Sequence, residues 1–208
     1  MVVIAFLTFI YLYPRLPLQV PLHWSLNGEV NGYGPSWVLA LIGPGMMAGE
    51  VVLFAILPRI SPQSYGLEAF EPAYLRLMLL TVAISGYLFA VLLAAAMGAP
   101  FQTMPVVLSG ISVFIVLMGN ELGKVHRNFF IGIRTPWTLA STRVWNSTHQ
   151  FARKSFVLTG LLALAVAIVD QYPILWLAVL LAGGLAPVLY SLIEYKKLKK
   201  RGELDGAS

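Results

Sequence analysis

The chain consists mainly of apolar runs separated by prolines, glycines and charged residues, and most of these runs are long enough to cross a bilayer as helices. About 20 residues are needed, because the hydrocarbon core is roughly 30 Å thick and a helix rises about 1.5 Å per residue. The runs cover residues 1–13, 37–57, 74–97, 104–122, 155–169 and 174–193. They predict an all-α, polytopic membrane helix bundle with about six transmembrane helices.

The composition also indicates a membrane protein. Hydrophobic residues make up 58% of the chain and charged residues only 11%, whereas soluble domains carry about 25% charged residues. The chain has no cysteine, which excludes disulfides and thiolate metal sites. We predict one integral membrane domain over residues 1–208, with a first span and outer loop in 1–36, a polar loop and interfacial helix in 120–154, and a basic tail in 194–208.

The first run is shorter than a full span. Thirteen residues give only about 20 Å of helix, so this segment must thin the bilayer, continue past Pro14 or be preceded by further sequence. A cleaved signal peptide is the competing interpretation. It is disfavoured, because no basic region precedes Val2 and no small-x-small cleavage site follows Tyr11.

Lysine and arginine are distributed unevenly among the connections. Of the fourteen, only Arg15 lies in the first outer loop, and the others lie between the second and third runs, between the fourth and fifth runs, and in the tail. The positive-inside rule then predicts cytoplasmic termini, a cytoplasmic polar loop and an external segment 14–36. We expect the basic tail to meet anionic lipid head groups, and no direct nucleic-acid partner, because only Tyr195 is interleaved with its basic residues.

The outer segment is predicted to be a compact, turn-rich cap. Its prolines favour extended or polyproline geometry in the first half, since each fixes φ and lacks a donor. Two Asn-Gly pairs, Asn27-Gly28 and Asn31-Gly32, are tight-turn signals.

Two interpretations of the aromatic residues in this cap remain open. His23 and Trp24 could bind an external ligand, or Trp24 and Tyr33 could anchor the cap at the membrane interface while His23 caps a turn. A metal site is not predicted, because His23 and Glu29 alone supply too few ligands.

The inner polar segment is predicted to be a glycine-hinged loop that leads into an amphipathic helix. Gly123 and Gly132 break the helix that ends near Leu122, Thr135 before Pro136 is a candidate N-cap, and Ser141 is a second one. From Val144 onward, apolar residues recur at spacings of three and four and continue into the fifth run. The aromatic residues Trp137 and Trp145 are candidate head-group anchors, and His149 shares the helical face of Trp145.

The charged residues of this segment have several possible roles. Arg134 could clamp an acidic partner or a lipid phosphate, pair with Glu121, or simply follow the positive-inside rule. A metal site formed by His126 and His149 is conceivable but not predicted, because their separation matches no standard ligand spacing. No cofactor is predicted.

Glu50 is the basis of a second class of function. An ionised side chain within the second run would cost about 2.5 kcal/mol or more unless it faced the bundle interior, so Glu50 could relay a proton or bind a cation in a small transporter. Asn120 or Tyr87 could be its polar neighbours, and the preceding Gly43-Pro44-Gly45 would loosen the helix. The alternative role is a neutral glutamic acid that fixes helix packing. No nucleophile–base pair or phosphate loop is present, so an enzyme is not predicted.

Two blocks of sequence carry a resemblance to a known family. The first comprises YPRLP at 13–17, VPLHW at 20–24 and NGEVNGY at 27–33, and the second comprises Asn120, Lys124, Asn128, GIRTPWTL at 132–139, Trp145, Thr148 and His149. With six spans in about 200 residues, the chain resembles the SdpI family of bacterial multi-pass membrane proteins. Two features depart from the family pattern. The first span is short, and Arg143 and Val144 replace the acidic residues common at the inner helix start, which puts stabilisation of the helix dipole there in question.

The resemblance implies an immunity and signal-transduction protein of the bacterial plasma membrane. Such a protein gives resistance to a secreted antimicrobial peptide and recruits a cytoplasmic autorepressor to the membrane. The resemblance places candidate binding residues in both polar segments. On the cytoplasmic side they are Asn120, Lys124, Asn128, Gly132, Arg134, Thr135, Pro136, Trp137, Trp145 and His149, and on the extracellular side they are His23, Trp24, Asn27, Gly28 and Tyr33.

Overall fold

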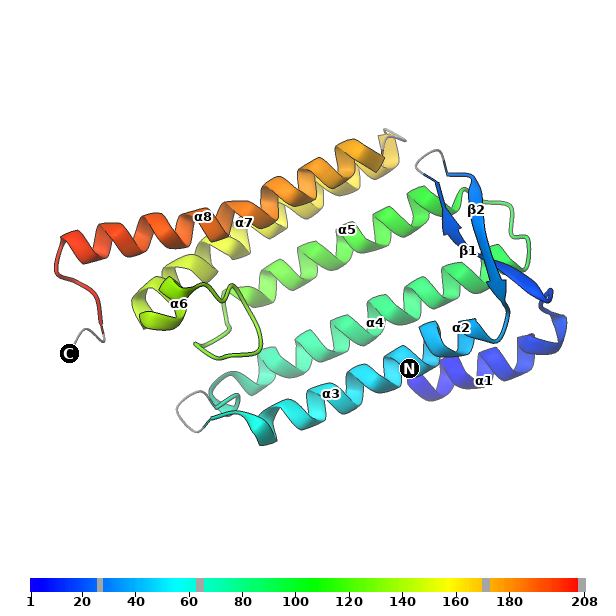
Figure 1. The fold of residues 1–208 in the computed structure, drawn as a ribbon, viewed down its shortest axis with the longest axis horizontal. Helices are drawn as coiled ribbons and strands as arrows, with labels where there is room; N and C mark the ends of the chain where they lie inside the picture. Colours follow the sequence, from blue (N-terminus) through cyan, green and yellow to red (C-terminus); the bar gives the residue numbers. More distant parts are fainter. Residues whose placement is uncertain (26–27, 63–65, 170–172, 206–208) are drawn as a thin grey trace.

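The computed structural model describes residues 1–25, 28–62, 66–169 and 173–205. Long helices lie side by side along the long axis, with a β-hairpin at one end and a polar loop at the other (Figure 1). In chain order the elements are α1 (Val2–Leu12), η1 (Tyr13–Arg15), β1 (Gln19–Trp24), β2 (Val30–Pro35), α2 (Val38–Ala40), η2 (Leu41–Gly45), α3 (Met46–Ile60), η4 (Glu68–Phe70), α4 (Glu71–Ala96), α5 (Thr103–Leu122), α6 (Pro136–Ala140), α7 (Thr142–Val169) and α8 (Pro173–Lys200). The predicted helix bundle is therefore confirmed.

Within the described residues, five helical segments are long and apolar enough to cross a membrane. They are Val38–Ile60, Glu68–Ala96, Thr103–Leu122, Thr142–Val169 and Pro173–Lys200. The first run forms α1, which has 11 residues and is about 16 Å long. It continues past Pro14 only as the single 3-10 turn η1, so this element is short, as its sequence predicts.

The outer segment differs from the predicted turn-rich cap. It is an antiparallel hairpin in which Val20 faces Gly34 and His23 faces Gly32. Gly28 turns the chain between the strands with a φ of +79°, which glycine adopts without steric cost. The second predicted turn is wrong, because Asn31 and Gly32 lie within β2 and Gly32 pairs with His23 of β1.

The second run is continuous but locally irregular. The π-helical turn η2 contains Pro44, which can neither donate a backbone hydrogen bond nor fit the preceding turn of a regular helix. A Cβ atom on Gly43 would lie 2.2 Å from Cδ2 of Phe89, so glycine is required for α4 to approach here. The loosening predicted from Gly43-Pro44-Gly45 is therefore a π turn.

The helices α5, α7 and α8 pack closely through small residues. A Cβ on Gly160 would lie 2.8 Å from the Ser112 carbonyl oxygen, and a Cβ on Gly183 would lie 1.9 Å from Oγ1 of Thr159. The indole of Trp176 also donates a 2.8 Å hydrogen bond to Oγ of Ser112. Such close approach is how membrane helices gain packing energy, because lipid supplies no hydrophobic drive between them.

Two apolar clusters lie toward opposite ends of the bundle. At the hairpin end, Val20 and Leu39 are fully buried in a cluster with Phe9 and Phe89. At the other end, Trp145 is buried beside Val125, Tyr74 and their neighbours. The hairpin and the polar loop are therefore each attached to the bundle by their own core.

The basic residues also separate along the long axis. Arg15 lies at the hairpin end, whereas the other lysines and arginines lie in the half of the bundle nearer the polar loop and the C-terminal tail (Figure 1). The charge asymmetry read from the sequence is thus an asymmetry between the two ends of the folded bundle.

Replacing Gly183 by alanine is expected to lower the free energy of unfolding by about 1–3 kcal/mol, because the added methyl group overpacks the α7–α8 contact against Thr159. Gly184→Ala is the matched control, since nothing lies within 4 Å of a Cβ there, and it should be neutral or up to about 1 kcal/mol more stable. Thermal unfolding of the purified protein in detergent measures both changes. Equal midpoints for the two variants would contradict this packing.

Candidate functional site

The polar loop, residues 123–135, joins α5 to α6 and is organised around Asn128. This side chain is fully buried. Its Nδ2 donates to the carbonyl oxygens of His126 (2.8 Å) and Ile131 (3.0 Å), while its Oδ1 accepts from the N–H groups of Phe130 (2.8 Å) and Ile131 (2.7 Å). One amide thus uses both donors and both acceptor positions to close a non-helical turn.

The stacked pair Trp145 and His149 supports the same loop from α7. Their ring centroids are 4.1 Å apart at an angle of 17°, and both side chains are buried. Nε1 of Trp145 donates to the Val125 carbonyl oxygen (2.8 Å), and Nε2 of His149 accepts from the Ile133 N–H (3.0 Å). The prediction that Trp145 and His149 share a helical face is confirmed. The prediction that Trp145 anchors the protein at lipid head groups is wrong, because this face packs under the loop rather than toward lipid.

Gly132 fits directly onto that stack. Its φ is +116°, a conformation that favours glycine. A Cβ at this position would lie 2.3 Å from Nε2 of His149 and 3.2 Å from Cζ2 of Trp145. The residue is therefore required for the loop to close over the two rings.

Both predicted N-caps are used, for two successive helices. Thr135 and Thr138 form a capping box at the start of α6, and the Thr135 hydroxyl lies 3.1 Å from that of Ser191 on α8. The short α6 then ends, and Oγ of Ser141 accepts from the Val144 N–H at the start of α7.

The acidic residue missing from the start of α7 is supplied by the C-terminal tail. A carboxylate oxygen of Asp205 accepts from the Thr142 N–H at 2.9 Å, and Asp205 also bonds the Arg143 N–H and the Ser141 hydroxyl. The tail is turned back by Gly202, whose φ is +66°, in a Schellman arrangement at the end of α8. The α7 dipole is therefore complemented from the far end of the sequence.

Burial raises the pKa of Asp205. Hydrogen bonds from the Ser141 hydroxyl and from the Arg143 and Thr142 N–H groups outweigh this effect, so the pKa lies below its usual value. The carboxylate is therefore stabilised in its charged form.

A buried carboxylate connects α4 and α5 at the same end. Glu121 accepts from Nε of Arg76 at 2.8 Å and from Nζ of Lys124 at 2.7 Å. The glutamate side chain is 8% exposed, while the two cations are 48% and 43% exposed. The alternative in which Arg134 pairs with Glu121 is excluded, because Arg134 instead donates to the Phe129 carbonyl oxygen.

The ten candidate residues at this end separate into two groups. Those that pack inward or form the loop are Asn128, Gly132, Thr135, Trp145 and His149, and those that are exposed or partly exposed are Asn120, Lys124, Arg134, Pro136 and Trp137. The first group holds the shape of the loop. The second group presents charge and aromatic surface on it.

A metal site involving His149 does not fit the geometry. Its Nδ1 lies 2.8 Å from the Trp145 carbonyl oxygen and its Nε2 accepts from Ile133, so both ring nitrogens are already bonded. His126 instead lies over Phe70, with ring centroids 6.0 Å apart. The part of the chain that the structure describes contains no cluster of three metal-ligating side chains.

At the hairpin end, the candidate residues lie on a small exposed surface. Nδ1 of His23 lies 2.5 Å from Oδ1 of Asn31 across the two strands, so His23 pairs within the sheet rather than capping a turn. Tyr33 is 64% exposed, Trp24 is partly exposed and Gly28 forms the turn. Asn27 lies outside the described residues.

Glu50 lies near the middle of the second span and faces α4. Its Oε1 accepts a 2.6 Å hydrogen bond from the Ser85 hydroxyl, whereas Oε2 is buried without a partner among the described residues. Neither Asn120 nor Tyr87, the neighbours suggested by the sequence, contacts it, and Tyr87 donates instead to the Val106 carbonyl oxygen.

Comparison with known proteins decides the family. The SdpI/YfhL protein family model matches residues 124–191, and a model of a domain of unknown function, DUF1648, matches residues 1–48. The chain is also 30% identical over 200 residues to the immunity protein SdpI of Bacillus subtilis (strain 168), which covers 96% of this chain and 93% of that protein. The chain belongs to the SdpI family.

The SdpI family match begins at the polar loop and continues through α7 and most of α8. The second matched region covers α1, the hairpin and the π turn. No solved structure is similar enough to this chain to count as a match. Membership of the family supports a multi-pass membrane protein with an immunity function, and neither the relative nor the matched families indicate an enzyme.

Some structural residues of this SdpI-family site were not identified from sequence. Thr138 belongs to the capping box, and a serine or threonine three residues after an N-cap is a detectable though weak signal. The Asp205 contact joins residues 63 positions apart, and nothing local in the sequence indicates it. The link from Glu121 to Arg76 spans 45 positions and depends on which helices are neighbours.

Asn128→Ala is expected to lower the free energy of unfolding by about 2–3 kcal/mol, because buried backbone groups of the loop lose their partners. Asn120→Ala removes the same side chain from an exposed position and should change the free energy of unfolding by less than about 0.5 kcal/mol. Thermal unfolding in detergent and limited proteolysis of the loop report both effects. A loop equally resistant to protease in the two variants would argue against the role of Asn128.

The contact between the tail and α7 should depend on pH. Because the folded-state pKa of Asp205 is lowered, its stabilising contribution is complete above the ordinary aspartate pKa and is lost as the pH falls through the lowered value. The protection of the Thr142 and Arg143 amides against hydrogen exchange, relative to their intrinsic exchange rates at the same pH, should therefore fall below about pH 4. Asp205→Asn should give fast exchange at neutral pH, and slow exchange in that variant would contradict the contact.

Proposed function

We propose that this protein protects a bacterium from a secreted antimicrobial peptide and also signals the presence of that peptide to a cytoplasmic autorepressor. The observation that carries the proposal is the relation to the immunity protein SdpI over nearly the whole length of both chains. The arrangement supports it, because a bundle with two distinct polar elements at opposite ends has one recognition surface available on each side of a membrane.

The orientation proposed here follows from charge. All lysines and arginines except Arg15 lie toward the polar-loop end, and such an excess is typical of the cytoplasmic side. The hairpin then faces outward, and the polar loop, the start of α7 and the basic tail face the cytoplasm of the bacterial cell.

The hairpin is the proposed receptor for the peptide. Val20 faces the core, while His23, Asn31 and Tyr33 are exposed. Leu18 and Trp37 beside them are 87% and 53% exposed. Aromatic and apolar side chains of this kind bind amphipathic peptides, since they supply contact area and retain a polar group for orientation. A peptide that partitions into the outer leaflet would meet this surface at the membrane boundary.

The polar loop is the proposed docking surface for the repressor. Lys124 and Arg134 of this loop and Trp137 of the adjoining α6 are exposed or partly exposed. Asn128 and His149 hold the loop by hydrogen bonds to its backbone N–H groups. Arginine and tryptophan are the residues most often dominant at protein interfaces. A surface held rigid in this way also loses little conformational entropy on binding.

Arg134→Ala or Trp137→Ala is expected to abolish signalling or protection while the protein still inserts, because truncating an interface residue of this type costs about 2 kcal/mol, roughly thirtyfold in affinity. Arg201→Ala, an exposed tail position, is the control. Survival in the presence of secreted peptides measures protection, and a pull-down from detergent-solubilised membranes with and without those peptides measures recruitment. Retention of neither a peptide nor a soluble transcription factor by the wild type would refute the proposal.

An ion-coupled carrier is the second candidate function, and the buried, unpartnered Oε2 of Glu50 is the observation that favours it. A carboxyl group in a transmembrane helix beside a π turn is a typical proton or cation site. On this alternative, Glu50→Gln abolishes ion-coupled flux in proteoliposomes and the polar-loop variants have little effect. Unchanged flux in Glu50→Gln would contradict the carrier function. The carboxyl group would then serve helix packing through its hydrogen bond with Ser85.

A further inference from the structure

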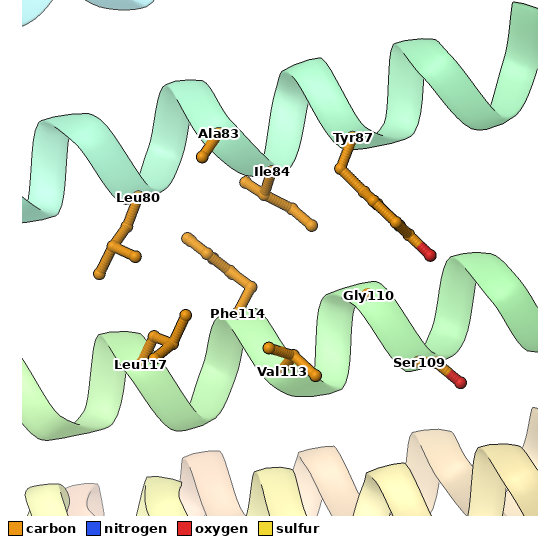
Figure 2. Close-up of a pocket in the computed structure, with 9 residues that line it drawn as sticks. All are labelled: Leu80, Ala83, Ile84, Tyr87, Ser109, Gly110, Val113, Phe114 and Leu117. Carbon is orange, nitrogen blue, oxygen red and sulfur yellow. The ribbon is translucent and has the colours of Figure 1, made fainter.

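A groove lined almost entirely by apolar side chains runs between α4 and α5. Nine residues of these two helices line it (Figure 2), and its volume is about 330 Å³. Leu80 and Leu117 lie toward the polar-loop end. At the other end the Tyr87 ring lies against Gly110, where a Cβ atom would be 2.0 Å from the ring, and the Tyr87 hydroxyl bonds the Val106 carbonyl oxygen. The groove is therefore closed by Tyr87 toward the hairpin.

The distance from Tyr87, at the closed end of the groove, to Arg76, one turn beyond Leu80 at its other end, matches one leaflet of a bilayer. From Tyr87 to Arg76 the α4 helix rises through eleven residues, about 16 Å. Half of the hydrocarbon core is about 15 Å thick. An acyl chain that extends from a head group level with Arg76 would thus end near Tyr87.

The end of the groove away from Tyr87 is charged. Arg76 lies one turn beyond Leu80 on the same face of α4, and Glu121 lies one turn beyond Leu117 on the same face of α5. Lys124, at the start of the polar loop, is held there by its ion pair with Glu121. Arg76 binds Glu121 only through Nε, and both cations are about half exposed. The two positive charges and one negative charge leave a net positive charge at the mouth of an apolar groove.

We propose that this groove binds one anionic phospholipid, with an acyl chain between α4 and α5 and its phosphate at Arg76 and Lys124. Basic sites between transmembrane helices select anionic head groups, and each lysine or arginine near the phosphate contributes about fivefold in affinity. The apolar length selects a membrane lipid rather than a soluble anion. The lipid would fill the groove between α4 and α5 and so join these two helices.

The test uses the purified full-length protein in detergent, with native mass spectrometry as phosphatidylglycerol or phosphatidylcholine of identical acyl chains is added. Arg76→Gln should lower the affinity for phosphatidylglycerol about fivefold and leave that for phosphatidylcholine unchanged, while Arg76→Lys should retain most of the preference. Arg201→Gln, which changes a tail charge away from the groove, is the control.

A second pair of variants tests the groove without touching the ion pairs. Val113→Phe fills the groove from an exposed position and should weaken binding of both lipids about tenfold, because about two methylene groups are excluded. Val188→Phe makes the same change on the exposed surface of α8 and should have no effect.

Three results would overturn the proposal. They are equal affinity of the wild type for the two lipids, equal lipid binding by Val113→Phe and Val188→Phe, and displacement of phosphatidylglycerol by an equal concentration of glycerol phosphate. The last result would assign the charged end to a free phosphate group and remove the role of the acyl chain.

Discussion

Backbone hydrogen bonding decides where this chain can leave the helical conformation. A bilayer offers no partners to exposed N–H and C=O groups, so the chain stays helical through its apolar spans and leaves the helix only at their ends, where buried backbone groups still need partners within the protein. The hairpin achieves this by pairing its two strands. The polar loop lacks such a partner strand and uses side chains instead, chiefly the Asn128 amide and the His149 imidazole. Several residues that the sequence offers as binding groups are therefore supports of the loop, and only their exposed neighbours are available for the proposed recognition.

The bundle combines a tightly packed part with a looser one. Glycine, serine and threonine let α5, α7 and α8 approach closely, whereas the boundary between α4 and α5 includes a groove and is tied at one end by Glu121, Arg76 and Lys124. The polar loop lies between the end of α5 and the capped starts of α6 and α7. The closely packed C-terminal helices thus hold the polar loop, and the N-terminal part carries the hairpin. A signal between the two ends would have to pass from α4 either to α5 or to the cluster of Tyr74, Val125 and Trp145.

The sequence predicted those features that arise from local pattern. Hydropathy placed the long spans, Thr135 and Ser141 were recognised as caps, and helical spacing put Trp145 and His149 on one face. It could not tell whether that face meets lipid or protein, because both surroundings accept aromatic side chains. The same reasoning predicts turns where the hairpin lies, since prolines and glycines are frequent in its strands. Contacts between distant segments, such as those of Ser85 with Glu50 and of Arg76 with Glu121, required knowledge of which helices are neighbours.

The carboxylate of Asp205 at the start of α7 also affects how this chain should be aligned with its relatives. An acid normally sits within the first turn of the helix it stabilises, so a column-by-column comparison around Arg143 would score this chain as having lost that residue. The carboxylate that bonds the Thr142 N–H instead comes from a residue 63 positions along the chain. An acidic side chain at either place would supply the same negative charge to the first turn of α7.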